Sequence, residues 1–156
     1  IEYEIPEYDW DGELSAVKDW VHRHVRYTRD PWGLETFRTP QQTLAAGAGD
    51  CDDLTALGMA LVETLGYKTR GDIIRGPKAK SWSHIKFDAG VPPGKLPDYW
   101  VPMELTMRRW PVGKDAPGRV VAERVYFEPG GVVRRVSAPR TKVVLQGFGG
   151  ARALTR

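Results

Sequence analysis

The segment Gly49–Gly66, GDCDDLTALGMALVETLG, places the chain's single cysteine where a glycine-rich turn becomes a helix. Apolar side chains recur through it at spacings of three and four residues, which predicts a helix with one buried face. These side chains are Leu54, Leu57, Leu61, Val62 and Leu65. Asp50 is placed to cap this helix and Gly66 to end it. We therefore expect the segment to form the central helix of the fold.

Cys51 falls in the first turn of that expected helix. The helix dipole favours negative charge there, so a thiol at this position gains thiolate character. Gly47 and Gly49 lie just before it and permit the close approach of another backbone or of a substrate. A lone cysteine is more often a small buried apolar residue, yet a glycine-rich approach and a helix N-terminus both suit a catalytic thiol. Cys51 is accordingly the predicted nucleophile.

Length and composition indicate one globular domain. The chain has 156 residues, of which 41% are hydrophobic and 28% are charged, as in ordinary globular proteins. We expect a single domain over 1–156, with a core at about 12–136, an acidic N-terminal arm and a basic C-terminal tail. No apolar run reaches the length of about 20 residues that spans a bilayer, so no membrane partner is expected. A single cysteine forms no internal disulfide, which fits a reducing compartment.

The net charge of +3 is unevenly distributed along the chain. From Gly118 onward basic residues outnumber acidic ones by six, whereas acidic residues gather in the first 13 positions. A basic end can contact nucleic acid, but these cations alternate with Val, Pro and Gly rather than with aromatic residues on which bases stack. We expect a solvated surface here and no nucleic-acid partner.

Two further helices are predicted before the central one. Apolar residues at helical spacing place the first over about 12–26, with Asp11 as its cap. A capping box that begins at Thr39, with Pro40 at the first helical position, starts the second, which should run to Ala46.

Strands are predicted mainly after the central helix. They are expected at Tyr67–Arg75, Ser83–Asp88, Tyr99–Met107, Val120–Phe127, Val132–Val136 and Lys142–Leu145. The second of these alternates polar and apolar residues, as a half-buried strand does, and should pair antiparallel with the third. Helices followed by antiparallel strands indicate an α+β fold.

A nucleophilic cysteine needs a base, and the base needs a third group that orients it. His84 is the candidate base because it opens a predicted strand 33 residues after Cys51, although a strand histidine can also simply face solvent. His22 and His24 lie two apart on a helix, so they point to different faces and are expected at the surface rather than at a metal. Glu104 lies in the neighbouring strand and is the candidate orienting acid.

Four motifs along the chain carry a resemblance to a known family. They are RYTRDP at Arg26–Pro31, GDCDD at Gly49–Asp53 with its helix, His84 at the start of a strand, and WVPMELT at Trp100–Thr106. Together these motifs resemble the transglutaminase-like superfamily of cysteine enzymes over roughly residues 12–107. The resemblance implies a papain-like fold with Cys51 as nucleophile, His84 as base and Glu104 as orienting acid. The family usually has Asp at this last position.

The resemblance also implies a mechanism. The Cys51 thiolate attacks a carboxamide carbonyl, and the Cys51 backbone N–H at the helix start donates one hydrogen bond to the oxyanion. A second oxyanion donor is expected from a side chain before the cysteine, and the candidates are Trp32, Gln41 and Gln42. No cofactor and no metal ion is expected.

The acyl acceptor stays open at this point. Water gives hydrolysis through a thioester acyl-enzyme, a lysine amine gives a cross-link, and a non-catalytic virion or assembly module could keep the same fold. The loops expected at 76–81 and 89–98 suggest an open, wet cleft and therefore hydrolysis of a protein or peptide substrate. The segment Asp30–Glu35 is similar to stand-alone members from bacteria and tailed phages. A phage structural protein is thus a further candidate partner, and a cytoplasmic or virion-associated location is expected.

Overall fold

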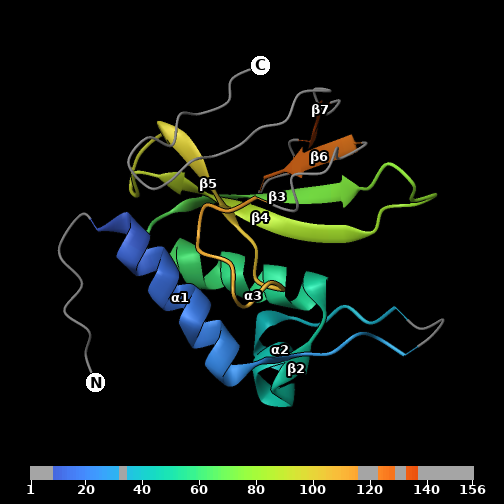
Figure 1. The fold of residues 1–156 in the computed structure, drawn as a ribbon. Coiled ribbons are helices and arrows are strands. Elements are labelled where there is room, and N and C mark those ends of the chain that lie inside the picture. The colour runs from blue at the N-terminus through green and yellow to red at the C-terminus, as the bar shows by residue number, and fades with distance from the viewer. Residues whose placement is uncertain (1–8, 32–34, 116–122, 129–132, 137–156) are drawn as a thin grey trace.

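Helices cover one face of a five-stranded sheet in the computed structural model of the chain (Figure 1). The structure describes residues 9–31, 35–115, 123–128 and 133–136. The helices are α1 (Trp10–His24), α2 (Pro40–Ala46) and α3 (Cys51–Thr64). The strands are β1 (Arg26–Tyr27), β2 (Ala48–Gly49), β3 (Lys68–Arg75), β4 (His84–Val91), β5 (Tyr99–Met103), β6 (Glu123–Phe127) and β7 (Val133–Val136).

The central helix α3 forms as predicted, because its cap and its apolar face are both present. The Asp50 side chain accepts hydrogen bonds from the backbone N–H groups of Asp52 and Asp53, at 3.3 and 3.5 Å. A Cβ placed on Gly58 would lie 2.5 Å from Leu105 and 2.6 Å from Phe87. The helix therefore packs closely on the sheet at a position where only glycine fits.

Helix α1 begins earlier than predicted. Asp9 is its cap and accepts a hydrogen bond of 2.9 Å from the backbone N–H of Gly12. The expected cap, Asp11, instead lies in the first turn. The prediction was wrong because both residues are Asp, and only the geometry tells which side chain turns back onto the helix. Helix α2 has the predicted bounds and capping box.

The large sheet is antiparallel and has the strand order β5-β4-β3-β6-β7. Its register pairs Ile74 with His84 and Phe87 with Met103, which confirms the predicted antiparallel pairing of β4 with β5. A second, two-stranded sheet was not predicted, since two residues are too few to show a period. In it β1 runs parallel to β2, with Tyr27 opposite Gly49.

Strand β4 differs from the half-buried strand expected at this position. It extends to Val91, and Lys86 is as buried as Phe87, because each face of the strand is covered. Strand β5 ends at Met103, earlier than expected, and leaves Glu104 just beyond the sheet. The first residues of the expected strand at 120–127, and all of those at 142–145, lie outside the described residues. So do the acidic arm at 1–8 and most of the basic tail.

The hydrophobic core lies between α1, α3 and the sheet. Its members include Leu14 and Val21 from α1, Leu54 from α3, and Phe87 and Met103 from the sheet. None of the helices in the described part of the chain has the length and apolar character of a membrane span.

Candidate active site

Cys51 is held at the first position of α3 by the turn before it. Strand β2 leads into this turn and is fixed by β1, where the backbone N–H of Thr28 donates a 2.8 Å hydrogen bond to the carbonyl of Gly49. The Thr55 hydroxyl donates to the carbonyl of Ile85 at 3.3 Å and ties the start of α3 to the start of β4. His84 lies at that start. Its imidazole is consequently close enough to Cys51 for the thiol to raise the pKa of His84.

Glu104 completes a chain of contacts that begins at Cys51. The His84 Nε2 and the Glu104 Oε2 are 2.6 Å apart, which leaves Nδ1 as the ring nitrogen for the cysteine. The other carboxylate oxygen of Glu104 accepts from the backbone N–H of Thr106 at 2.9 Å and from its hydroxyl at 2.6 Å. Both oxygens are thus engaged, so the carboxylate has one orientation.

The charges of this cluster follow from its burial and contacts. The side chain of His84 is 23% exposed and that of Glu104 only 1%. Burial alone would lower the pKa of His84, but hydrogen bonds and charge interactions with Cys51 and Glu104 outweigh it and raise the pKa to about 9. Burial would raise the pKa of Glu104, but contacts with His84 and Thr106 lower it overall. At neutral pH the imidazole is therefore a cation and the carboxylate an anion.

Lys18 positions the segment that carries Glu104, and the sequence prediction missed it. This buried side chain donates through Nζ to the carbonyl of Glu104 at 2.6 Å and to that of Met107 at 3.0 Å. Burial lowers its pKa, against the attraction of Glu104. A signal was available, because Lys18 lies on the apolar stripe of its helix between Leu14 and Val21. A lysine at such a position needs polar partners inside the protein.

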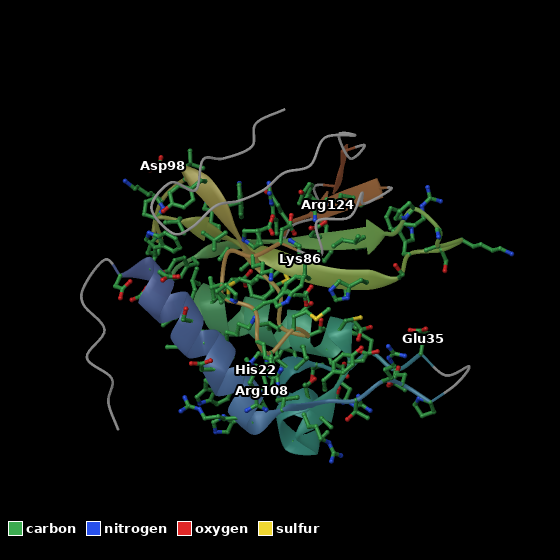
Figure 2. All side chains as sticks on the ribbon, in the orientation of Figure 1. His22, Glu35, Lys86, Asp98, Arg108 and Arg124 are labelled. Carbon is green, nitrogen blue, oxygen red and sulfur yellow. The ribbon has the colours of Figure 1, made fainter. Side chains whose placement is uncertain are left out.

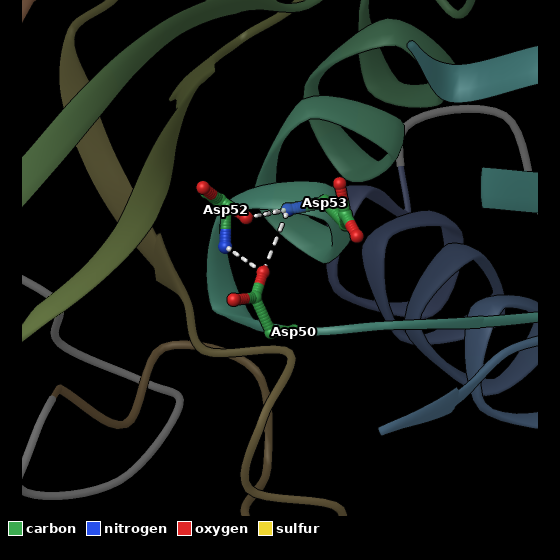
Figure 3. Close-up of side chains that lie close together, drawn as sticks. All are labelled: Asp50, Asp52 and Asp53. Carbon is green, nitrogen blue, oxygen red and sulfur yellow. Dashed lines mark hydrogen bonds between the residues drawn. The ribbon is translucent and has the colours of Figure 1, made fainter. Parts of the chain in front are cut away.

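Three acidic residues at the start of α3 lie close together, as Figure 3 shows. One carboxylate oxygen from each of Asp50, Asp52 and Asp53 lies within 4.8 Å of the other two, a spacing at which such oxygens could hold a metal ion. Asp53 accepts from the backbone N–H of Arg38 at 2.8 Å and pairs with its guanidinium at 2.6 Å, so it anchors the segment before α2. Burial, and then the hydrogen bond and charge of Asp50, raise the pKa of Asp52 to about 7. Capping and this ion pair account for the cluster.

The candidate oxyanion donors have different surroundings. The Cys51 backbone N–H is at the first helical position, where no intrahelical acceptor exists. The Gln42 side chain accepts from the backbone N–H of Thr39 at 2.9 Å as part of the capping box, and Gln41 is exposed on α2. Trp32 lies outside the described residues. Among the candidates that the structure describes, the Cys51 N–H is the donor next to the sulfur.

Comparison with known proteins gives the family. The model of the transglutaminase-like superfamily matches residues 5–105, which is more than half of the chain. The chain belongs to this superfamily. This membership, together with the described helices and antiparallel sheet, confirms the predicted α+β, transglutaminase-like fold.

No curated protein matches the chain. A solved structure of a candidate cysteine protease from Cytophaga hutchinsonii is similar to it, with a TM-score of 0.48 and 19% sequence identity. The similarity covers 85% of this chain and 48% of that protein, so this chain spans about half of its length.

Proposed function

We propose that this protein is a cysteine-dependent hydrolase of amide or peptide bonds. The observation that carries the proposal is the 2.6 Å contact of His84 with Glu104, beside a cysteine at the N-terminus of α3 that raises the pKa of the imidazole. Membership of the transglutaminase-like superfamily supports a cysteine-enzyme function in the broad sense.

The first half of the reaction follows from the charge of His84. An imidazolium beside a sulfur favours the thiolate, which is the nucleophilic form of cysteine. The Cys51 sulfur attacks the carbonyl carbon of the substrate amide, and the oxyanion accepts a hydrogen bond from the Cys51 backbone N–H. The C–N bond then breaks as the imidazolium gives its Nδ1 proton to the leaving amine. The products are a free amine and a thioester on Cys51.

The second half regenerates the enzyme with water. The now neutral imidazole of His84 takes a proton from a water molecule, whose oxygen attacks the thioester carbonyl. The C–S bond breaks, the acid is released, and Cys51 returns as a thiolate beside an imidazolium. Glu104 stays ionised in both halves and holds the proton on Nε2, so that Nδ1 faces the reacting atoms.

Solvent access supports water as the acceptor. The residues at 80–83, directly before His84, are exposed, and the imidazole itself is partly exposed. An enzyme that transfers the acyl group to an amine must keep water away from the thioester. Exposure on this side of the site is more compatible with hydrolysis.

The test offers a peptide library that includes glutamine-containing peptides, together with an excess of a primary amine, and weighs the products by mass spectrometry. We expect cleaved or deamidated peptides to exceed amine adducts, and we expect no products with a folded Cys51→Ala variant. A majority of amine adducts would instead identify a cross-linking enzyme. No product at all from the unmodified protein would favour a non-catalytic assembly module.

A further inference from the structure

A basic pocket of about 360 Å³ lies next to the candidate active site. It is formed by the C-terminal end of α1, by β1 and by the segment that follows Glu104. Figure 2 shows His22 and Arg108 close together at that end of α1. The pocket has the size of the smaller ligand sites in proteins.

Its polar lining is cationic. Arg23, Arg26 and Arg108 all line it and are all exposed. Within the described part of the chain, no carboxylate forms an ion pair with any of these three side chains. Asp19 acts on the pKa of the pocket residue His22 but does not itself line the pocket. Three guanidinium groups therefore line one pocket, and none of them forms an ion pair with a described carboxylate.

Both histidines that line the pocket are already engaged, since the Nδ1 of His24 lies 2.7 Å from the carbonyl of Trp20. The Nε2 of His22 is 2.7 Å from the carbonyl of Leu105 and is oriented by it. The guanidinium groups, in contrast, keep their donors for a ligand. Guanidinium is planar and offers paired N–H donors that match the two oxygens of a carboxylate.

The pocket is connected to the candidate active site through shared residues. Thr106 lines the pocket and also donates two hydrogen bonds to Glu104. Leu54 lines it one helical turn after Cys51, a Cα separation of roughly 5 Å. A polypeptide with its carbonyl at Cys51 therefore needs only about two extended residues, at about 3.3 Å each, to span this separation.

We propose that this pocket binds the carboxylate of an acidic side chain in the substrate, a few residues from the bond that reacts. The inference rests on the proposed hydrolase for the placement of the polypeptide, whereas the binding itself requires no catalysis. Arg108 and Arg23 contact the carboxylate. The protein is thus selective for acidic sequences.

Binding is tested without catalysis, in the full chain carrying Cys51→Ala and labelled for NMR. The probes are N-acetyl-glutamate N-methylamide, its uncharged glutamine analogue and inorganic phosphate. We expect the glutamate compound to shift the amide signals of Tyr27, Leu54 and Thr106 in a saturable way, and the glutamine compound to leave them unchanged. Equal shifts from both compounds, no shifts, or shifts from phosphate alone would each overturn the proposal.

Two matched variants assign the binding to the pocket. Arg108→Gln should weaken the binding of the glutamate compound about fivefold, the ratio expected of an exposed ion pair. Arg109→Gln removes the same charge from the next residue, which is exposed and does not line the pocket, and should leave binding unchanged. Equal weakening in both variants would show general charge attraction and overturn the proposal.

Measurements of peptide hydrolysis distinguish a failure of the carboxylate pocket from a failure of the proposed hydrolase function. If the protein hydrolyses peptides, Arg109→Gln should leave the kinetic constants unchanged, whereas Arg108→Gln should raise KM for acidic substrates. An unchanged KM for acidic substrates would overturn the pocket alone. If no peptide is hydrolysed while the glutamate compound still binds, the proposed function fails and the carboxylate site stands.

Discussion

Two cations on the same strand, His84 and Lys86, lie two residues apart in β4. Both contact carboxylates, but they differ in burial and in the number of carboxylates around them. The Lys86 Nζ lies 2.7 Å from Asp88 and 2.9 Å from Asp72, and its side chain is 1% exposed. The His84 side chain is 23% exposed and contacts one carboxylate, that of Glu104.

This difference in surroundings gives the two cations different roles: the charge of Lys86 stabilises the fold, whereas the proton of His84 takes part in the proposed reaction. Burial would lower the pKa of Lys86, but the surrounding carboxylates raise it, so its proton stays in place at any ordinary pH. His84 has one nitrogen fixed by Glu104 and the other next to a thiol, and its pKa of about 9 lies within reach of neutral pH. A proton that is fixed stabilises the fold, whereas a proton that can move performs chemistry.

The largest expected effects come from removing each cation in turn. His84→Ala should reduce hydrolysis by about 10³-fold or more, because base and acid are both lost. Lys86→Met should leave the buried carboxylates of Asp72 and Asp88 without the ammonium that both of them contact and destabilise the fold by about 3–5 kcal/mol.

Kinetics and denaturant unfolding on the same samples provide the measurement. Lys68→Met, an exposed lysine on the adjacent strand β3, is the matched control and should change neither quantity. If Lys86→Met lost activity without losing stability, the assignment of Lys86 to stability and of His84 to catalysis would be wrong.

Glu104→Gln changes the carboxylate partner of His84 and leaves Lys86 and its carboxylates unchanged, so it tests the His84 side of the comparison. The amide keeps the size of the side chain but presents either N–H or C=O to the ring, so the tautomer with a proton on Nε2 is no longer enforced. We expect kcat to fall by about 10²- to 10⁴-fold, as for the acid of a catalytic triad. Glu35→Gln, an exposed glutamate, is the control. Full activity of Glu104→Gln would assign the orienting role to another group.

The pH dependence of stability tests the charge of His84. Its pKa in the folded protein, about 9, lies above its ordinary value of 6.5. The contribution of this residue to stability is therefore complete below pH 6.5 and is lost as the pH rises through about 9. The difference in unfolding free energy between the protein and His84→Ala should be larger at pH 6 than at pH 10. A difference independent of pH would contradict the assigned charge.

The smallest effect is expected from Asp52 in the first turn of α3. The folded pKa of Asp52 is about 7, above its ordinary value of 3.8, so the folded state loses stability as the pH rises from about 4 to 7. Asp52→Asn should consequently raise the melting temperature slightly at pH 8 and leave it unchanged below pH 4. Asp98→Asn, at an exposed aspartate, is the control. A loss of stability at pH 8 would show that the ionised form is the favoured one.

Much of the helical structure could be predicted from sequence because its signals are local. The Asp50 cap and the apolar spacing of α3 lie within one turn or one face of the helix, and so does the capping box that begins at Thr39. The structure places His84, at the start of β4, beside Glu104 and close enough to Cys51 for the thiol to raise the pKa of the imidazole.

The contacts that support the site depend on long-range packing, which spacing does not reveal. Lys18 reaches the Glu104 carbonyl across 86 positions, and Arg38 reaches Asp53 across 15. The same limit applied to Lys86, whose alternation with apolar neighbours predicted a solvated face. Both faces of β4 are covered. The alternation in this strand therefore separates side chains in the apolar core, such as Phe87, from buried charged side chains, such as Lys86, and not core from solvent.

The most direct test of the central claim, that His84 activates Cys51, requires no substrate. The rate of Cys51 alkylation by iodoacetamide is measured at pH 6 for the protein, for His84→Ala and for the urea-unfolded chain, with intact-mass detection. We expect the folded protein to react at least about tenfold faster than the other two, since an adjacent imidazolium favours the thiolate. Equal rates in the folded protein and in His84→Ala would contradict the claim.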